Sequence, residues 1–177
     1  RRLSKVYVRG DQVIPVLVDI NLDVAAGDYV ALMGPSGSGK STLLRMCNRL
    51  EVPTAGRVLL DGDDVGGVDP TVLRSRVGMV FQRPVVFGGT VLDNLRVADA
   101  EVGEEGACAV LDRCGLDAGL LERGADALSG GEAQRMCLAR TLLTGPEVVL
   151  MDEATSALDV DARQNVELLS RLAIPGA

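Results

Sequence analysis

Gly34-Pro35-Ser36-Gly37-Ser38-Gly39-Lys40-Ser41 is the stretch of this sequence that decides the fold. It matches the pattern G-x-x-x-x-G-K-[ST] at every fixed position. Glycines let the backbone bend closely around an anion, so that successive N–H groups and the positive end of the following helix point toward it. A flexible Gly/Ser turn beside a surface lysine is the alternative. Because a strand pattern precedes the stretch and a helical pattern follows it, the sequence predicts a phosphate-binding loop.

The residues of this loop have separate predicted tasks. Lys40 supplies a positive charge for the β- and γ-phosphates, and the Ser41 hydroxyl is placed to coordinate Mg²⁺. Tyr29 to Met33 is the apolar run that predicts the preceding strand, and apolar residues at helical spacing begin after Lys40. The predicted nucleotide-binding residues of this segment are Gly34, Pro35, Ser36, Gly37, Ser38, Gly39, Lys40, Ser41 and Thr42.

An acidic pair follows a second apolar run. Val148 to Met151 predicts a buried strand, and Asp152 and Glu153 follow it, at the edge of a parallel sheet where ligand chemistry usually lies. Asp152 can hold Mg²⁺ through its water shell, and Glu153 can polarise an attacking water. A solvated helix cap is the alternative interpretation of the two acids alone. Gln82 follows a predicted strand at Val77 to Phe81 and can reach the metal and the water as a neutral ligand.

Strand and helix patterns alternate along the chain, which predicts an α/β fold with a largely parallel sheet. Leu3 to Val24 alternates polar and apolar residues around a Gly10-Asp11 turn, which predicts an antiparallel hairpin or small sheet. From Gln82 to Leu128 the patterns are helical with no convincing strand, so we expect a helical insertion. The further elements expected are a strand at Gly56 to Leu60, a surface loop at Asp61 to Pro70, and helices at Thr90 to Leu95, Glu104 to Cys114, Gly131 to Leu143 and Val160 to Leu172.

The composition excludes several classes of protein. With 177 residues, 47% of them hydrophobic, the chain can bury a core of ordinary size and is not disordered. Its apolar runs fall far short of the ~20 residues that a membrane-spanning helix needs, so a membrane role requires a partner. A net charge of −7 and the scarcity of aromatic residues argue against nucleic acid as a partner.

Cysteine and histidine usage narrows the chemistry further. The four cysteines match no metal knuckle or redox pair, so we interpret them as reduced core thiols in a cytoplasmic protein. They are Cys47, Cys108, Cys114 and Cys137. The chain contains no histidine, which removes general catalysis by histidine and the commonest zinc ligand.

Leu128-Ser129-Gly130-Gly131-Glu132-Ala133-Gln134-Arg135 closely resembles the LSGGQ signature of ATP-binding cassette (ABC) proteins. Physically, a serine and two glycines at the start of an amphipathic helix make a second anion site. The resemblance runs from about Leu3 to Leu172 and implies a P-loop NTPase, RecA-like core that binds ATP and Mg²⁺. Within one cassette domain at 1–177 we expect a β subdomain with the phosphate loop at 1–81, a helical insertion at 82–128, and the signature helix with the acidic pair at 129–177.

Further motifs carry the same resemblance. Tyr7 in Ser-Lys-x-Tyr looks like the aromatic residue that stacks on adenine, although a strand tyrosine can also serve packing alone. Gln82 looks like the family's Q-loop glutamine. Asp159 ends Ser156-Ala157-Leu158-Asp159, which looks like the D-loop that communicates across a dimer. Glu153, with Lys40 and Gln82, makes up the catalytic set that the resemblance implies.

The resemblance also implies partners. In the family two subunits bind head to tail, so that Ser129, Gly130 and Gly131 of one copy would clamp the γ-phosphate held by the other copy's phosphate loop. The segment after Gln82 is where a membrane permease docks, which places Pro84 to Phe87 against the transporter. The implied function is ATP binding and hydrolysis by a cytoplasmic subunit, peripheral to the inner face of the cell membrane, that drives transport through a separate permease.

Segments on both sides of the helical insertion indicate a branch of the family. Val80 to Leu95 and Gly131-Glu132-Ala133-Gln134 resemble bacterial stand-alone subunits of the phosphate-importer or iron-exporter type. Soluble cassette ATPases of DNA repair or translation are one alternative, but they carry long insertions, paired cassettes or basic surfaces. A kinase with a phosphate loop, or a nucleotide-binding module without hydrolysis, is another alternative. A kinase has no use for the signature segment, and a pure binder does not need Glu153.

Two departures from the family pattern lead to a further expectation. Family members carry a switch histidine and one more core strand beyond the catalytic glutamate, whereas this chain has no histidine and ends soon after Glu153. The resemblance therefore implies a cassette truncated at its C-terminus, with one late core strand missing. We expect the chain alone to be destabilised and to hydrolyse ATP poorly, while its phosphate loop still binds nucleotide.

Overall fold

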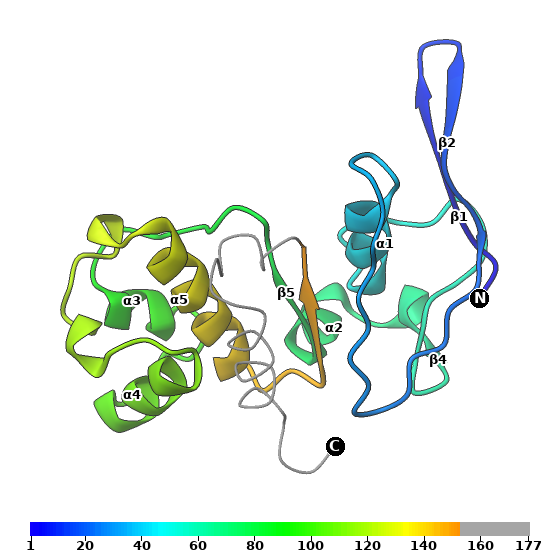
Figure 1. Ribbon diagram of the computed structural model, residues 1–177. Helices are drawn as coiled ribbons and strands as arrows, with labels where there is room; N and C mark the ends of the chain where they lie inside the picture. The colour runs from blue at the N-terminus through cyan, green and yellow to red at the C-terminus, as the bar shows by residue number, and fades with distance from the viewer. Residues whose placement is uncertain (153–177) are drawn as a thin grey trace. The chain divides into compact units, whose positions relative to one another are not determined.

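The structure is a computed structural model that describes residues 1–152 (Figure 1). This part of the chain divides into two compact units, one formed by Arg1–Val77 and the other beginning at Gly78, and each is described by itself. Among these residues, no helix is long and apolar enough to span a membrane. The predicted helix at Val160 to Leu172, the predicted catalytic Glu153 and Asp159 of the predicted D-loop all lie outside the described residues.

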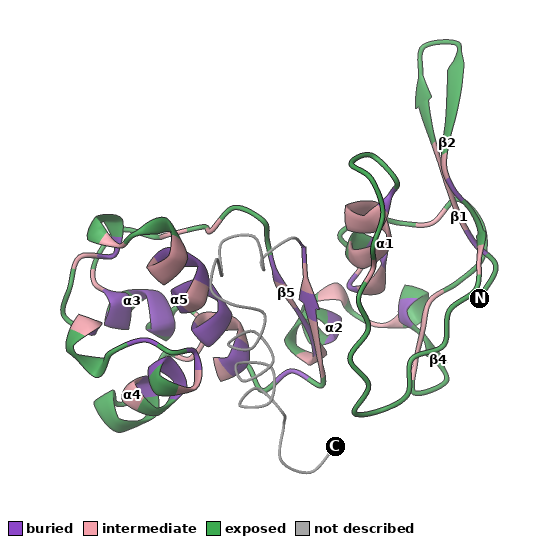
Figure 2. Ribbon diagram, viewed as in Figure 1, coloured by how far each residue is buried: buried purple, intermediate pink, exposed green. Residues whose placement is uncertain are grey.

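An antiparallel hairpin opens the first unit, as the alternating pattern predicts. β1 (Leu3–Arg9) pairs with β2 (Gln12–Ile20). The turn between them includes Gly10, whose φ of 60° lies in the left-handed region that glycine adopts without strain. The far end of the hairpin is exposed, and residues near its base are buried (Figure 2). The prediction of a hairpin around Gly10-Asp11 is therefore confirmed.

The core of the first unit joins the hairpin to a helix. α1 (Lys40–Cys47) begins where the helical spacing of the sequence begins. Leu3 and Leu17 of the hairpin pack with Met46 of α1, and all three are buried. The hairpin and the helix that follows the predicted phosphate loop therefore share one small apolar core.

The remaining elements of the first unit are short. The predicted strand at Gly56 to Leu60 is confirmed only at its last two residues, which pair with two residues of the predicted surface loop. Asp69 begins the next helix by accepting hydrogen bonds from the N–H groups of Thr71 and Val72 at 2.8 and 3.3 Å. These elements are β3 (Leu59–Leu60), β4 (Asp63–Asp64), a 3-10 helix at Val65–Gly67, and α2 (Pro70–Arg76).

Tyr29 to Met33 does not form the predicted strand. Met33 is 92% exposed, and Tyr29 and Val30 are also exposed. A strand requires backbone hydrogen bonds to a neighbour, and no described strand pairs with this segment. The described strands form three two-stranded sheets, of which β1–β2 and β3–β4 are antiparallel. The apolar run is visible in the sequence, but the pairing that would make it a strand is not.

Two strands and the helices between them form the second unit. β5 (Val77–Val80) begins at the boundary between the units and lies beside β6 (Val148–Met151), and the two strands run in the same direction (Figure 1). The N–H of Asp152 donates to the carbonyl of Val80 at 3.0 Å. Both predicted strands are confirmed, and the long connection between them is helical, as parallel pairing requires.

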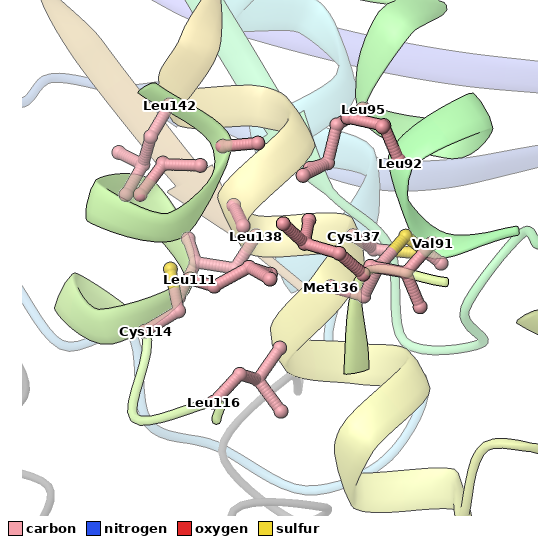
Figure 3. Close-up of a cluster of buried hydrophobic side chains, with 14 of the residues drawn as sticks. Val91, Leu92, Leu95, Leu111, Cys114, Leu116, Met136, Cys137, Leu138 and Leu142 are labelled. Carbon is pink, nitrogen blue, oxygen red and sulfur yellow. The ribbon is translucent and has the colours of Figure 1, made fainter. Parts of the chain in front are cut away.

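The helices of the second unit enclose its core. α3 (Val91–Arg96), α4 (Glu104–Arg113) and α5 (Gly130–Leu143) begin and end within one residue of the predicted bounds. Their apolar side chains point toward one another (Figure 3), and Leu95, Leu111 and Met136 are completely buried. This cluster is the main apolar core of the described chain, which agrees with the helical insertion predicted from Gln82 to Leu128.

The cysteines lie in or beside these cores. All four are free, Cys114 and Cys137 are buried, and Cys47 and Cys108 are partly buried. Burial raises the pKa of the Cys114 thiol to about 12, and burial also raises the pKa of Cys47 and of Cys137. These three thiols are therefore held in the neutral form, as apolar core residues rather than nucleophiles.

Candidate functional site

The predicted phosphate loop is a tight turn around the Lys40 ammonium group. Lys40 Nζ donates to the carbonyl oxygens of Gly34 and Pro35 at 2.8 and 3.0 Å. The backbone closes on itself where the N–H of Ser38 donates to Pro35 at 3.2 Å. Gly39 is the N-cap residue of α1, and its φ of 91° is a backbone conformation that residues with a Cβ rarely adopt. The loop thus holds its positive charge at the N-terminus of a helix, where an anion is favoured.

At two of its glycines, this loop leaves no room for larger residues, as expected of a phosphate cradle. A Cβ added at Gly34 would lie 2.9 Å from the Ser38 hydroxyl oxygen, and one added at Gly39 would lie 2.8 Å from Leu17 Cδ2. Gly39 also lies against Val16, so the loop is seated on β2. The residues present therefore fit a phosphate group: close backbone, left-handed glycines and one ammonium group converge at a helix N-terminus.

Gly39→Ala is expected to damage both the fold and the site. The left-handed φ costs alanine about 1–2 kcal/mol, and the contact with Leu17 adds further strain. Gly10→Ala is the matched control, because Gly10 also has a positive φ but its Cβ would meet open space. Chemical denaturation should show a larger loss of unfolding free energy for Gly39→Ala than for Gly10→Ala, and ATP titration should show an affinity loss for Gly39→Ala alone. Equal losses in the two variants would contradict the role of the Leu17 contact.

Tyr7 lies in the same unit as the phosphate loop. It sits on β1 opposite Ile14 of β2, and the residue is 36% exposed. Strand β2 is also the strand that touches Gly39 of the loop, through Val16 and Leu17. The partly exposed Tyr7 ring therefore lies on β1, and β1 pairs with β2, the strand that touches the phosphate loop. This arrangement is compatible with the predicted stacking on adenine and also gives the ring a packing role.

Ser129 begins α5 through a reciprocal pair of hydrogen bonds. Its hydroxyl oxygen accepts from the N–H of Glu132 at 3.3 Å, and its own N–H donates to Glu132 Oε2 at 2.7 Å. This is a capping box, whose S-x-x-E pattern is visible in the sequence although the sequence analysis did not single out Glu132. Gly130 and Gly131 form the first turn of the helix. The signature segment therefore has a structural task in addition to its predicted contact with phosphate.

The Glu132 carboxylate makes this cap dependent on pH. Hydrogen bonding from the Ser129 N–H is the largest cause that lowers the pKa of Glu132 below its usual 4.5. A lowered pKa in the folded state means that the cap stabilises the fold above pH 4.5 and that this stabilisation is lost as the pH falls through the lowered value. Denaturant titrations should therefore show that wild type is more stable than Glu132→Gln near neutral pH. The difference between their unfolding free energies should become smaller as the pH falls. Glu105→Gln is the control, because α4 has no side-chain cap hydrogen bond, and an equal trend in both variants would contradict the prediction.

Gln82 and Asp152 follow the ends of neighbouring strands. Gln82 comes two residues after β5 and is exposed, whereas Asp152 follows β6 directly and is 5% exposed. The Gln134 side chain on α5 donates to the carbonyl of Phe81 at 2.7 Å, so the residue before Gln82 is tied to the signature helix. Gln134 belongs to the signature segment, but its hydrogen bond to Phe81 was not predicted because the two residues are distant in sequence. The second unit thus brings together the strand ends that carry these two predicted metal ligands.

The predicted site residues as a whole are divided between the two units. The phosphate loop, with Ser41 and Thr42, belongs to the first unit, and Ser129 and Asp152 belong to the second. Within residues 1–152, no group of three or more His, Cys, Asp or Glu residues forms a metal site. The Mg²⁺ ligands remain predictions.

A hollow lies beside β5 on the surface that the sequence analysis assigns to a permease. It has a volume of about 260 Å³ and includes Arg83, Pro84 and Val85 in its lining. The Arg140 guanidinium lies 4.7 Å from the centroid of the Phe87 ring and donates to the carbonyl of Val85 at 2.8 Å. Val85 and Phe87 are 50% and 44% exposed. α5 therefore supports an apolar, positively charged surface at 83–87.

Comparison with known proteins gives one family model and many relatives. A family model described as "ABC transporter" matches residues 17–156. Protein STAR1 of Oryza sativa subsp. japonica is 49% identical over 168 residues, which are 90% of this chain and 46% of STAR1. The chain covers between 27% and 59% of the length of the first three curated relatives it matches. The relatives include proteins named for import and a structure named for export.

Solved structures share the fold. A dimeric ATP-binding cassette in a post-hydrolysis state, bound to ADP and Pi, has a TM-score of 0.83 and 31% identity over 97% of this chain and 79% of its own. A bacterial Atm1-family ABC exporter with ATP bound has a TM-score of 0.85 and 33% identity over 97% of this chain and 31% of its own. The predicted fold class is therefore confirmed, whereas the roles of individual site residues remain predictions.

Proposed function

The chain belongs to the ABC transporter family, and from this premise we propose that it binds and hydrolyses ATP to drive transport through a separate membrane permease. The observation that carries the proposal is the phosphate loop, in which the Lys40 ammonium lies within 3.0 Å of two loop carbonyls at the start of α1. When ATP binds, Lys40 transfers its hydrogen bonds from Gly34 and Pro35 to the phosphates. The N-terminus of α1 stabilises the same charge.

We assign the chemical step to the residues that the family resemblance implies. Ser41, Gln82 and Asp152 would hold Mg²⁺, which neutralises phosphate charge when bound. Glu153 orients the attacking water and accepts its proton. Lys40 stabilises the charge that develops on the transferred phosphoryl group. Tyr7 receives the adenine.

We propose that two copies of the chain act as a head-to-tail dimer. Ser129, Gly130 and Gly131 of one copy would contact the γ-phosphate bound by the other copy, and Asp159 would take part in communication between them. The capping box supports this, because the N-terminus of α5 is formed before any partner arrives. A solved relative is a dimeric cassette, and another is described as part of the ABC transporter complex cbiONQ.

The surface at 83–87 is proposed to receive the permease, which would hold the chain at the inner face of the cell membrane. Its exposed apolar side chains, Arg83 and the neighbouring Arg140 of α5 support this assignment. The likeness to stand-alone subunits of the phosphate-importer or iron-exporter type rests on Val80 to Leu95 and remains a prediction. The short helical region and the net charge of −7 favour transport over the soluble repair or translation classes.

A mixing experiment tests the head-to-tail arrangement. Lys40→Met removes the phosphate contact. Gly130→Asp places a carboxylate at the N-terminus of α5, where the new side chain meets open space. The carboxylate would repel phosphate at this position. Light scattering with Mg²⁺ and a slowly hydrolysed ATP analogue should show monomers for each variant alone and a recovered dimer for their mixture. In the mixed dimer, one of the two nucleotide sites combines the intact phosphate loop of the Gly130→Asp copy with the intact signature segment of the Lys40→Met copy.

Gly103→Asp is the matched control for this experiment. It introduces the same carboxylate at the N-terminus of α4, also in open space, and should leave dimer formation unchanged. If the mixture shows only the sum of the two separate samples, the head-to-tail dimer is wrong. If Lys40→Met alone still forms the nucleotide-dependent dimer, the proposed role of the phosphate loop is wrong.

A further inference from the structure

The Lys5 ammonium makes three contacts, one of them with the Tyr7 ring. Its ammonium lies 4.8 Å from the centroid of that ring. The same ammonium donates to the carbonyl of Val52 at 2.8 Å and pairs with Glu51 Oε2 at 2.8 Å. The Lys5 side chain is only 14% exposed and that of Glu51 28%, so the pair is largely shielded from water. A cation held at this position attracts the aromatic face through the ring's quadrupole.

Glu51 and Val52 lie just beyond the helix that follows the phosphate loop. The N–H of Glu51 donates to the carbonyl of Arg45 on α1 at 3.0 Å, so Glu51 is fixed to the end of that helix. Hydrogen bonding from Lys5 is the largest cause that lowers the pKa of the Glu51 carboxyl, and the Tyr7 hydroxyl acts in the same direction. Lys5, Tyr7 and Glu51 thus connect β1 to the phosphate-loop helix.

We propose that Lys5 is a positioning residue for nucleotide binding, which covers one face of the Tyr7 ring and presents the other face to the adenine. This inference rests on the proposed function, in which Tyr7 receives the base. Lys5 is anchored by Glu51 and Val52, so the ring is held before the nucleotide arrives. A ring that is already ordered loses less side-chain freedom on binding, which increases affinity for the base but not for the phosphates.

Tyrosine fluorescence gives a direct readout of this interaction. The chain has two tyrosines and no tryptophan, so Tyr29→Phe leaves Tyr7 as its only emitting residue. In that background, ATP and base-free tripolyphosphate are titrated, and the ratio of their dissociation constants isolates the contribution of the base. Lys5→Met keeps the apolar stem of the side chain and removes the cation. We expect ATP affinity to fall about three- to tenfold and tripolyphosphate affinity to stay unchanged.

Three further variants separate positioning from charge and from folding. Arg9→Met is the matched control, because Arg9 lies on the same face of β1 but makes none of the cation–π contacts found within residues 1–152, and it should leave the ratio unchanged. Lys5→Arg restores a cation and should bring ATP affinity back to within about twofold of wild type. Glu51→Gln weakens the ion pair that anchors Lys5 but leaves the Lys5 ammonium in place. It should change the ratio of the ATP and tripolyphosphate dissociation constants in the same direction as Lys5→Met.

The results separate the positioning role of Lys5 from the proposed stacking of adenine on Tyr7. Tyr7→Ala carries no emitting tyrosine in this background, so its affinities are measured by isothermal titration calorimetry. If Tyr7→Ala lowers ATP affinity but Lys5→Met and Glu51→Gln do not, the positioning role of Lys5 is wrong and base stacking stands. If Tyr7→Ala leaves the ratio unchanged, the proposed stacking itself is wrong. If Lys5→Met weakens ATP and tripolyphosphate equally, Lys5 acts through general charge or folding, and the inference is overturned.

Discussion

Lys40→Met is expected to lower the affinity of the chain for ATP about 100-fold. The Lys40 ammonium is the charge at the centre of the phosphate loop, where it lies within hydrogen-bond distance of Gly34 and Pro35. A hydrogen bond to a charged group contributes about 1.5–3 kcal/mol, and about 3 kcal/mol corresponds to a factor of more than 100 in the dissociation constant. Isothermal titration calorimetry with ATP measures this directly.

Arg45→Met is the control for this prediction. Arg45 lies on the same helix, is exposed, and sits in the last turn rather than the first. Its removal changes the net charge by the same amount and should alter ATP affinity by less than about threefold, because an exposed charge is screened by solvent and salt. Comparable losses for the two variants would mean that general charge, and not the position of Lys40 in the loop, determines binding.

Leu95→Ala is expected to lower the unfolding free energy by about 2–5 kcal/mol. Leu95 is 0% exposed in the cluster formed by α3, α4 and α5, so truncation leaves a cavity among close-packed side chains. Val97 immediately follows α3 and is 60% exposed, so Val97→Ala should change stability by less than about 0.5 kcal/mol. Urea denaturation followed by circular dichroism measures both. A loss below about 1 kcal/mol for Leu95→Ala would mean that the cluster is loosely packed.

The helices and the hairpin were predictable because their signals are local. Gly10 sits between two alternating runs, and Thr90 and Ser129 stand at the first residue before a helical pattern, where their side chains cap the helix. Tyr29 to Met33 shows where this reasoning ends. Its apolar residues are those of a strand, but a strand exists only when a distant segment pairs with it.

The candidate site likewise contains residues that could be recognised from the sequence and residues that could not. The phosphate loop is a continuous segment whose glycine spacing determines its backbone, so Gly34, Gly39 and Lys40 could be recognised from the sequence alone. Gln134 could not, because its partner Phe81 is 53 residues away. Lys5 was missed for a similar reason, since it reaches Val52 across 47 residues. Contacts of this kind depend on the fold and have no pattern along the chain.

α5 links two surfaces mechanically. Its first turn carries the signature glycines, and farther along Gln134 and Arg140 hold the carbonyls of Phe81 and Val85. With 14 residues it is about 21 Å long, and it joins the two surfaces as one continuous helix. We therefore expect a displacement of the 83–87 surface to reach Ser129 as a movement of the whole helix.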